Sequence, residues 1–116
     1  MKNFKELRIW QKGMEIAVGC YKLIENFPKE ERYGLSSQIT RCGVSIPSNI
    51  AEGSGRRTEI DYRRFIDISL GSSYELETQL LIAQYVKFGN QELLAEMLNR
   101  VSEEQKMLMG FGNKLG

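Results

Sequence analysis

The stretch Ser45-Ile-Pro-Ser-Asn-Ile-Ala-Glu-Gly53 combines two isoleucines at helical spacing with a proline and four polar side chains. Ile46 and Ile50 are four residues apart, which places them on the same face of an α-helix. That face extends toward the N-terminus, because the preceding apolar residues keep a spacing of three or four: Leu35, Ile39 and Cys42. The pattern predicts an amphipathic helix that contains the quoted stretch.

Pro47 is unusual inside such a helix. Proline lacks a backbone N–H, and its ring presses on the carbonyl four residues earlier, here that of Gly43. Glycine has no side chain to crowd this contact, and the neighbouring serine and asparagine side chains can bond backbone groups that the proline leaves unpaired. We therefore predict a proline-kinked second helix that continues to about Glu52.

The helix on the N-terminal side carries two apolar seams. It should run from about Glu6 to Asn26, because Phe27-Pro28 ends it. One seam is Leu7, Trp10, Met14, Ala17, Tyr21 and Ile24, and the other is Ile9, Gly13, Ile16, Cys20, Leu23 and Phe27. A single seam suits a two-stranded coil, so two seams predict more than one helical neighbour. We expect this helix to face both its own bundle and another subunit.

Two further helices follow the quoted stretch. A polar connection, residues 29–34, precedes that stretch, and a loop over residues 53–57 follows it. Thr58 is the expected N-cap of a third helix that reaches about Phe88, and Gly89-Asn90 forms a stop and a cap for a fourth. Short connections make neighbouring helices antiparallel. The predicted fold class is all-α: an antiparallel up-and-down four-helix bundle in one domain, residues 1–116.

The composition has a normal globular balance of 41% hydrophobic and 27% charged residues. No apolar run approaches the roughly 20 residues that a membrane helix needs. The first residues are not followed by the apolar segment of a secretory signal. We therefore expect a cytoplasmic protein that does not bind a membrane.

Histidine is absent from the chain, which excludes nucleophilic catalysis of the Ser–His or Cys–His type. The common metal-ligand spacings are missing too, since Cys20 and Cys42 stand as two isolated cysteines. We expect them to be reduced and buried as small hydrophobic groups; a pairing between helices is the alternative. The sequence predicts no catalytic, cofactor-binding or metal-binding residue and no enzyme activity.

The polar and special residues of the quoted stretch form a candidate structural motif. They are Ser45, Pro47, Ser48, Asn49, Glu52 and Gly53. Buried polar groups need hydrogen-bond partners, and the serines and glutamate within residues 69–75 of the third helix can supply them. Such a network would fix the register of the two helices; the alternative is a ligand or partner site.

An arginine cluster is the remaining feature. Four arginines fall within nine residues, and a fifth candidate comes from the second helix: Arg56, Arg57, Arg63 and Arg64, with Arg41. Arginine binds phosphate bidentately, and phosphate contacts supply most non-specific affinity for nucleic acid. Acidic residues interleaved with the cluster would neutralise part of its charge. These arginines are candidate nucleic-acid contacts.

Several motifs taken together point to one family. They are Phe4-Lys-Glu-Leu-Arg-Ile-Trp10-Gln11, Tyr33-Gly34-Leu35-Ser-Ser-Gln38-Ile39, residues 45–53 followed by Gly55-Arg56, Tyr62-Arg-Arg-Phe65, and Glu75-Leu-Glu-Thr-Gln-Leu80. Over nearly its whole length, the sequence resembles the four-helix-bundle proteins encoded in intervening sequences of bacterial 23S ribosomal RNA genes. The nine residues 45–53 are the most specific part of this resemblance.

The resemblance implies a four-helix bundle that forms a homopentamer. The accessory proteins of diversity-generating retroelements are similar in fold, and they form a barrel-like pentamer that engages nucleic acid and a reverse transcriptase. The implied partners are therefore further copies of the chain, RNA or DNA, and, by analogy, a protein such as a reverse transcriptase. This chain is nearly neutral, whereas the retroelement proteins are strongly basic. The family pattern implies no catalytic residue and no cofactor.

Two functions of different classes follow. The first is a non-enzymatic, homo-oligomeric bundle protein associated with RNA or DNA, which the arginine cluster and the resemblance favour. The alternative is a structural or protein-interaction assembly module without nucleic-acid binding, which the doubled seam and the balanced charge favour.

Overall fold

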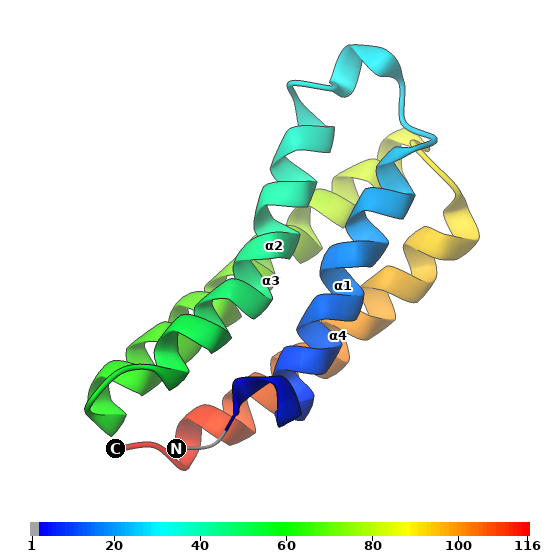
Figure 1. Cartoon of the computed structure of the whole chain (residues 1–116). Helices are drawn as coiled ribbons and strands as arrows, with labels where there is room; N and C mark the ends of the chain where they lie inside the picture. Colours follow the sequence, from blue (N-terminus) through cyan, green and yellow to red (C-terminus); the bar gives the residue numbers. More distant parts are fainter. Residues whose placement is uncertain (1–2) are drawn as a thin grey trace.

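The computed structural model describes residues 3–116, and every regular element in this range is a helix. Figure 1 shows four long helices that pack side by side, with two short 3-10 turns in the N-terminal third of the chain. The elements are η1 (Phe4–Glu6), α1 (Arg8–Ile24), η2 (Lys29–Glu31), α2 (Leu35–Ser54), α3 (Glu59–Val86) and α4 (Gln91–Asn113). The predicted all-α four-helix bundle is confirmed.

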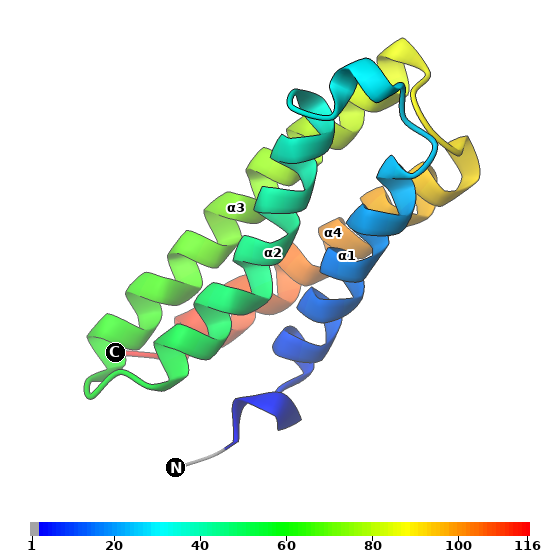
Figure 2. The ribbon, with the colours of Figure 1, turned by 45° about the horizontal axis from the view of Figure 1, so that its top comes forward.

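The helices form a cycle in which each packs against two neighbours. The contacting pairs are α1–α2, α2–α3, α3–α4 and α1–α4. The chain colours in Figure 1 show that successive helices run in opposite directions along a molecule of 43 × 23 × 20 Å. Figure 2 places the α1–α2 and α3–α4 connections at one end, and the α2–α3 turn with the C-terminus at the other.

The start of α1 differs from the sequence-based expectation. Leu7 has extended backbone angles, φ −75° and ψ 131°, and it separates η1 from α1. The predicted start at Glu6 is therefore two residues too early, and the helix ends at Ile24 rather than Asn26. The Asn3 side chain accepts a hydrogen bond from the Lys5 backbone N–H. This cap stabilises the separate N-terminal turn.

The two seams of α1 have different surroundings. Residues of one seam are buried in the core, among them Ile9, Ile16, Cys20 and Leu23. The other seam is mixed: Met14 is 39% exposed and Tyr21 is 55% exposed, whereas Ala17 is buried and the remaining three residues pack partly buried against the core. The helix therefore presents a second apolar face outside its own bundle.

Helix α2 continues through Pro47 and ends at Ser54. Gly43 allows α2 to approach α1 closely, because a Cβ at this position would lie 2.7 Å from Cys20 Sγ and 3.5 Å from Ala17 Cα. The close packing of α1 against α2 therefore favours glycine at position 43.

The caps of the last two helices follow the sequence signals. The Thr58 side chain accepts from the Asp61 N–H, and the Asn90 side chain accepts from the N–H groups of Glu92 and Leu93. Both predicted N-caps are confirmed. The end of α3 is different: Lys87, with φ 63°, takes the left-handed conformation that ends the helix, two residues before Gly89.

Candidate functional site

Two polar contacts join the stretch 45–53 of α2 to α3. Ser45 Oγ lies 2.8 Å from Ser72 Oγ, and the buried Ser69 hydroxyl donates to the Ile46 carbonyl at 2.9 Å. Asn49 completes the cluster, because its amide donates to the carbonyl and hydroxyl oxygens of Ser45. The prediction that these two helices hydrogen-bond to each other is confirmed. A neutral hydrogen bond contributes about 1 kcal/mol, and its directionality fixes the register of the pair.

Other residues of the stretch are divided between the interior and the surface. Gly53 is buried, and a Cβ there would lie 2.8 Å from Phe65 Cβ. Pro47 is also buried, whereas Ser48 and Glu52 are exposed. The inward side of the stretch is occupied by helix packing, so a ligand or partner can reach only its outer side.

Four arginines lie around the α2–α3 turn, and all four are exposed: Arg56, Arg57, Arg63 and Arg64. We call this surface the arginine end. The C-terminal residues lie beside it (Figure 1), where an Arg63 guanidinium N–H donates to the Leu115 carbonyl at 3.4 Å. The fold thus brings the two arginine pairs, separated in sequence by the start of α3, onto one end of the bundle.

Three acidic residues, Glu52, Glu59 and Asp61, lie among the four arginines, so residues 52–64 carry a net charge of +1. Arg56 forms an ion pair with Glu52 at 2.7 Å, and its guanidinium lies 4.5 Å from the centre of the Phe65 ring. Within residues 3–116, Arg57 and Arg64 have no carboxylate at ion-pair distance. Exposed i,i+4 ion pairs contribute little free energy. The Arg56 guanidinium can therefore exchange Glu52 for a phosphate.

Arg41 lies apart from the other four arginines. It is exposed on α2, thirteen residues before the last residue of that helix, Ser54. At 1.5 Å per residue this is about 20 Å along the helix axis. A compact phosphate group cannot touch both Arg41 and the arginine end, although an extended strand has the necessary length.

Helix α4 buries a carboxyl group that sequence analysis missed. Glu104 is fully buried, and neither of its carboxyl oxygens has a hydrogen-bond partner within residues 3–116. A Cβ on Gly13 would lie 3.2 Å from Glu104 Oε2 and 3.4 Å from Pro47 Cα, so the carboxyl lies between α1, α2 and α4. Burial raises the pKa of Glu104 to about 8; Lys12 lowers this pKa and Glu15 raises it. The side chain is a neutral acid at pH 7.

Both thiols are free and buried. Burial raises the pKa of Cys20 to about 12, with a further contribution from Cys42. Burial also raises the pKa of Cys42, whose sulfur accepts a hydrogen bond from the Gln79 amide at 3.4 Å. Because the thiolate is the nucleophile, both cysteines serve as core residues in the closed bundle.

The exposed seam of α1 and the facing side of α2 enclose an apolar groove of about 370 Å³. We call it the α1–α2 groove, and its lining residues are Trp10, Met14, Ala17, Val18, Tyr21, Val44, Pro47, Ser48 and Ala51. Contiguous exposed apolar surface marks sites of protein interaction. The groove is the structural counterpart of the second α1 face predicted from the sequence.

These surfaces offer guanidinium groups at one end and apolar area along one side. In the part of the chain that the structure describes, no three Cys, Asp or Glu side chains are placed to hold a metal ion. No helix among these residues is long and apolar enough to cross a bilayer. The arrangement is suited to binding phosphates and other protein chains.

Comparisons with known proteins identify relatives of the chain. A family model described as 23S rRNA-intervening sequence protein matches residues 5–110. A crystal structure of a protein of unknown function from the S23 ribosomal protein family of Bacteroides thetaiotaomicron has a TM-score of 0.79 and 26% sequence identity. The match covers 89% of this chain and 96% of that one. No curated protein matches the chain.

Proposed function

The chain belongs to the 23S rRNA-intervening sequence protein family, and from this premise we propose that it is a non-enzymatic, homo-oligomeric bundle protein that contacts RNA through its arginine end. The observation that carries the proposal is the gathering of Arg56, Arg57, Arg63 and Arg64 at one exposed end of the bundle. Each guanidinium group in such a cluster can donate hydrogen bonds to a phosphate of an RNA backbone.

Assembly strengthens the proposal. We infer that copies associate through the α1–α2 groove, and that the assembly is the homopentamer implied by the family resemblance. In a ring with all chains pointing the same way, the arginine ends lie on one rim. Several weak phosphate contacts on one RNA then act together, because each contact after the first is made at high effective concentration. A nearly neutral chain can bind RNA in this way.

Salt-dependent binding to RNA tests the proposal. The intact protein should retard a single-stranded RNA in a mobility-shift assay at ~50 mM salt, and the affinity should fall steeply as salt rises. The double variant Arg56→Ala/Arg57→Ala should weaken binding to all sequences. It should also reduce the slope of log K against log salt by about 1.4 for each chain that contacts the RNA, since each lost contact with a single strand contributes about 0.7.

Arg41→Ala is the matched control, because Arg41 is also exposed but lies far from the arginine end. Its binding should stay close to that of the unmodified protein. If this variant alone lost RNA binding, the RNA site would lie on the side of α2 rather than at the arginine end. Absence of any complex at micromolar protein and ~50 mM salt would overturn the proposal.

A second candidate function is a protein-interaction module that does not bind nucleic acid. The apolar α1–α2 groove favours it, since this surface is shaped for a protein chain and carries no charged lining residue. By analogy with the retroelement proteins, a reverse transcriptase is a candidate partner. Affinity capture from native cells before and after nuclease treatment separates the two functions: a partner retained after nuclease supports this one, and RNA recovered by itself supports the first.

A further inference from the structure

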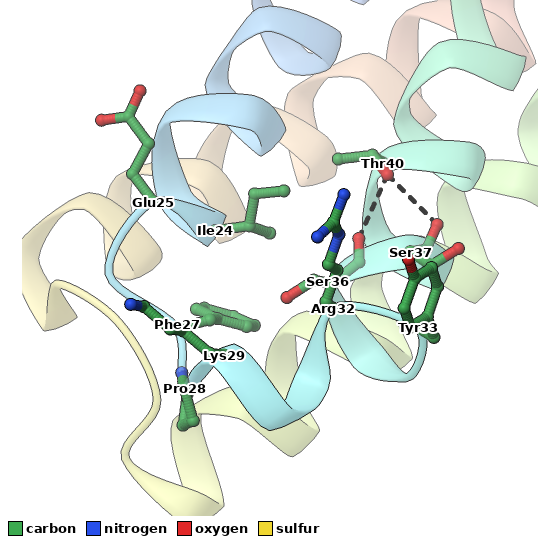
Figure 3. Close-up of a pocket in the computed structure, with 10 residues that line it drawn as sticks. All are labelled: Ile24, Glu25, Phe27, Pro28, Lys29, Arg32, Tyr33, Ser36, Ser37 and Thr40. Atoms are coloured by element: carbon green, nitrogen blue, oxygen red, sulfur yellow. Dashed lines mark hydrogen bonds between the residues drawn. The ribbon is translucent and has the colours of Figure 1, made fainter.

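A second cavity lies at the opposite end of α2 from the arginine end. It has a volume of about 710 Å³ and opens between the end of α1, η2 and the first turns of α2 (Figure 3). Its lining residues are Ile24, Glu25, Phe27, Pro28, Lys29, Arg32, Tyr33, Ser36, Ser37 and Thr40. The cavity combines an apolar floor from the α1 end with cationic and hydroxyl groups from η2 and α2.

Arg32 places a free positive charge in this cavity. Figure 3 shows its guanidinium extending between Ile24 and Thr40, while the Glu25 carboxylate points away from it. Within residues 3–116, no carboxylate lies at ion-pair distance from Arg32. Its guanidinium lies 5.3 Å from the centre of the exposed Tyr33 ring. The five N–H donors of this group are therefore available to an anion.

Ser36 adds a hydroxyl group to the cavity. The residue as a whole is 6% exposed, and within residues 3–116 its hydroxyl forms no hydrogen bond, while its oxygen remains accessible from the cavity. Figure 3 shows this hydroxyl pointing into the cavity, toward the space between Arg32 and Phe27. A ligand atom in the cavity can therefore replace water as the hydrogen-bond partner of this hydroxyl.

The backbone at the start of α2 adds further donors. The Leu35 N–H donates to Glu31 Oε1 at 3.1 Å, whereas the N–H groups of Ser36 and Ser37 have no partner within residues 3–116. Such free N–H groups and the helix dipole attract anions. Glu31 is not among the residues that line the cavity, and its carboxylate caps the Leu35 N–H, which leaves the next two N–H groups for a ligand.

We propose that this cavity binds an organic phosphate of nucleotide size, whose phosphate is held by Arg32, the Ser36 hydroxyl and the first N–H groups of α2. The volume far exceeds that of a phosphate ion and lies within the range of small-molecule pockets. Phe27 and Ile24 form an apolar floor for the organic part of the ligand. The site does not depend on RNA binding at the arginine end, because about 30 Å of α2 separates the two.

Adenosine 5′-monophosphate is the probe, and adenosine is its matched control without the phosphate. Titration of the isotope-labelled full-length protein should give saturable amide shifts at Ser36 and Ser37 with the monophosphate and none with adenosine.

Arg32→Gln and Ser36→Ala should each weaken binding about tenfold, the effect of losing a hydrogen bond to a charged group. Arg41 directly follows Thr40 but is exposed and does not line the cavity, so Arg41→Gln should bind like the unmodified protein. Spectra without ligand establish that each variant is folded.

Two sources of the phosphate are distinguished by oligonucleotides with and without a 5′-phosphate. If the cavity binds the end of a nucleic acid, the phosphorylated oligonucleotide should bind more tightly than the other. Arg32→Gln should abolish this difference, whereas Arg56→Ala/Arg57→Ala should keep it. Equal binding of the two, with the monophosphate still saturable, assigns it to a free phosphate compound. The proposal would be overturned if potassium chloride of equal ionic strength gave the same amide shifts as the monophosphate. It would also be overturned if Arg32→Gln left the amide shifts unchanged.

Discussion

Glu104 is a buried carboxyl group that accepts no hydrogen bond within residues 3–116, and the favourable effect of Lys12 on its charge is smaller than the cost of burial. Its Oε2 lies beside Gly13, where α1 has no side chain, because a Cβ on that glycine would lie 3.2 Å from this oxygen. The charged form is therefore the costly one, and the fold tolerates Glu104 because the acid is neutral near pH 7.

The stability of the bundle should fall as pH rises from 5 to 8. In the folded state the pKa of Glu104 is raised to about 8, so the folded chain retains a proton that the unfolded chain has released. Proton retention by the folded state means that the free energy of unfolding decreases with pH until about pH 8. Urea unfolding at a series of pH values measures this slope.

Glu104→Gln should remove most of the slope, because the amide does not ionise. Glu103→Gln is the control, since that side chain is exposed and pairs with Lys12 at 3.7 Å. It should keep the slope of the unmodified chain. Equal slopes in the unmodified protein and in Glu104→Gln would show that the Glu104 carboxyl is ionised in the folded bundle.

Glycine to alanine substitutions should have opposite effects at two positions in helices. At Gly43 the added methyl group would lie 2.7 Å from Cys20 Sγ, so the helices must separate, at a cost of about 1–3 kcal/mol. At Gly71 nothing lies within 4 Å of the added group, so higher helix propensity should stabilise the protein by up to ~1 kcal/mol. Denaturant midpoints of the two variants test the signs, and stabilisation by Gly43→Ala would contradict the close approach.

At the scale of the helix, Lys87 ends α3 at a conformational cost. Its φ of 63° is the left-handed region, where a Cβ clashes with the following carbonyl and glycine is favoured. Lys87→Gly should therefore raise the free energy of unfolding by about 0.5–1 kcal/mol. Lys87→Ala keeps the Cβ and should give no such gain, and thermal unfolding of the two variants separates these outcomes.

The spacing of apolar residues predicted the four helices well, because the buried positions of a helix recur with the same spacing. It did not predict the helix ends where a local hydrogen bond or a single backbone angle decides where the helix begins or stops. Leu7 fits the apolar pattern, yet the Asn3 cap forms a separate turn before it. At the end of α3, the left-handed position is occupied by Lys87 rather than by glycine, so the sequence does not mark this residue as a helix end. Hydrogen bonds and single backbone angles of this kind leave little trace in hydrophobic spacing.

The site residues were predictable to different degrees. Arg56 and Arg64 come together because a tight turn joins their helices, whereas the distance of Arg41 follows from helix length. Glu104 had a readable signal, since it continues the spacing of Val101 on the buried face of α4. A charged residue at a core position is ordinarily on the surface, so the pattern was not sufficient. The cavity around Arg32 depends on how a loop folds over the bundle end, which periodicity does not describe.

At the scale of the whole molecule, the α1–α2 groove should hold the chains of the assembly together. Light scattering of the unmodified protein should give a mass several times 13.3 kDa. The double variant Met14→Glu/Tyr21→Glu places carboxylates in the groove, and burying a charge in an interface is costly. This variant should scatter as a single chain with unchanged helix content.

Met109→Glu is the matched control for the assembly experiment. Met109 is 43% exposed, close to the 39% of Met14, but it lies on α4 and outside the groove. Its mass should remain that of the assembly. A single-chain mass for the unmodified protein at micromolar concentration would contradict both the groove as an interface and the homopentamer.

The contact between Cys20 and Gly43 has a kinetic consequence. An alkylating reagent consumes thiolate, and the Cys20 sulfur meets solvent only in molecules in which α1 has separated from α2. The rate of its modification in native buffer therefore reports how often that helix pair opens. Cys42, whose sulfur accepts a hydrogen bond from Gln79 of α3, is 8% exposed, compared with 0% for Cys20. Its reaction therefore gives a rate for a thiol near the surface of the closed bundle, against which the slower rate of Cys20 can be compared.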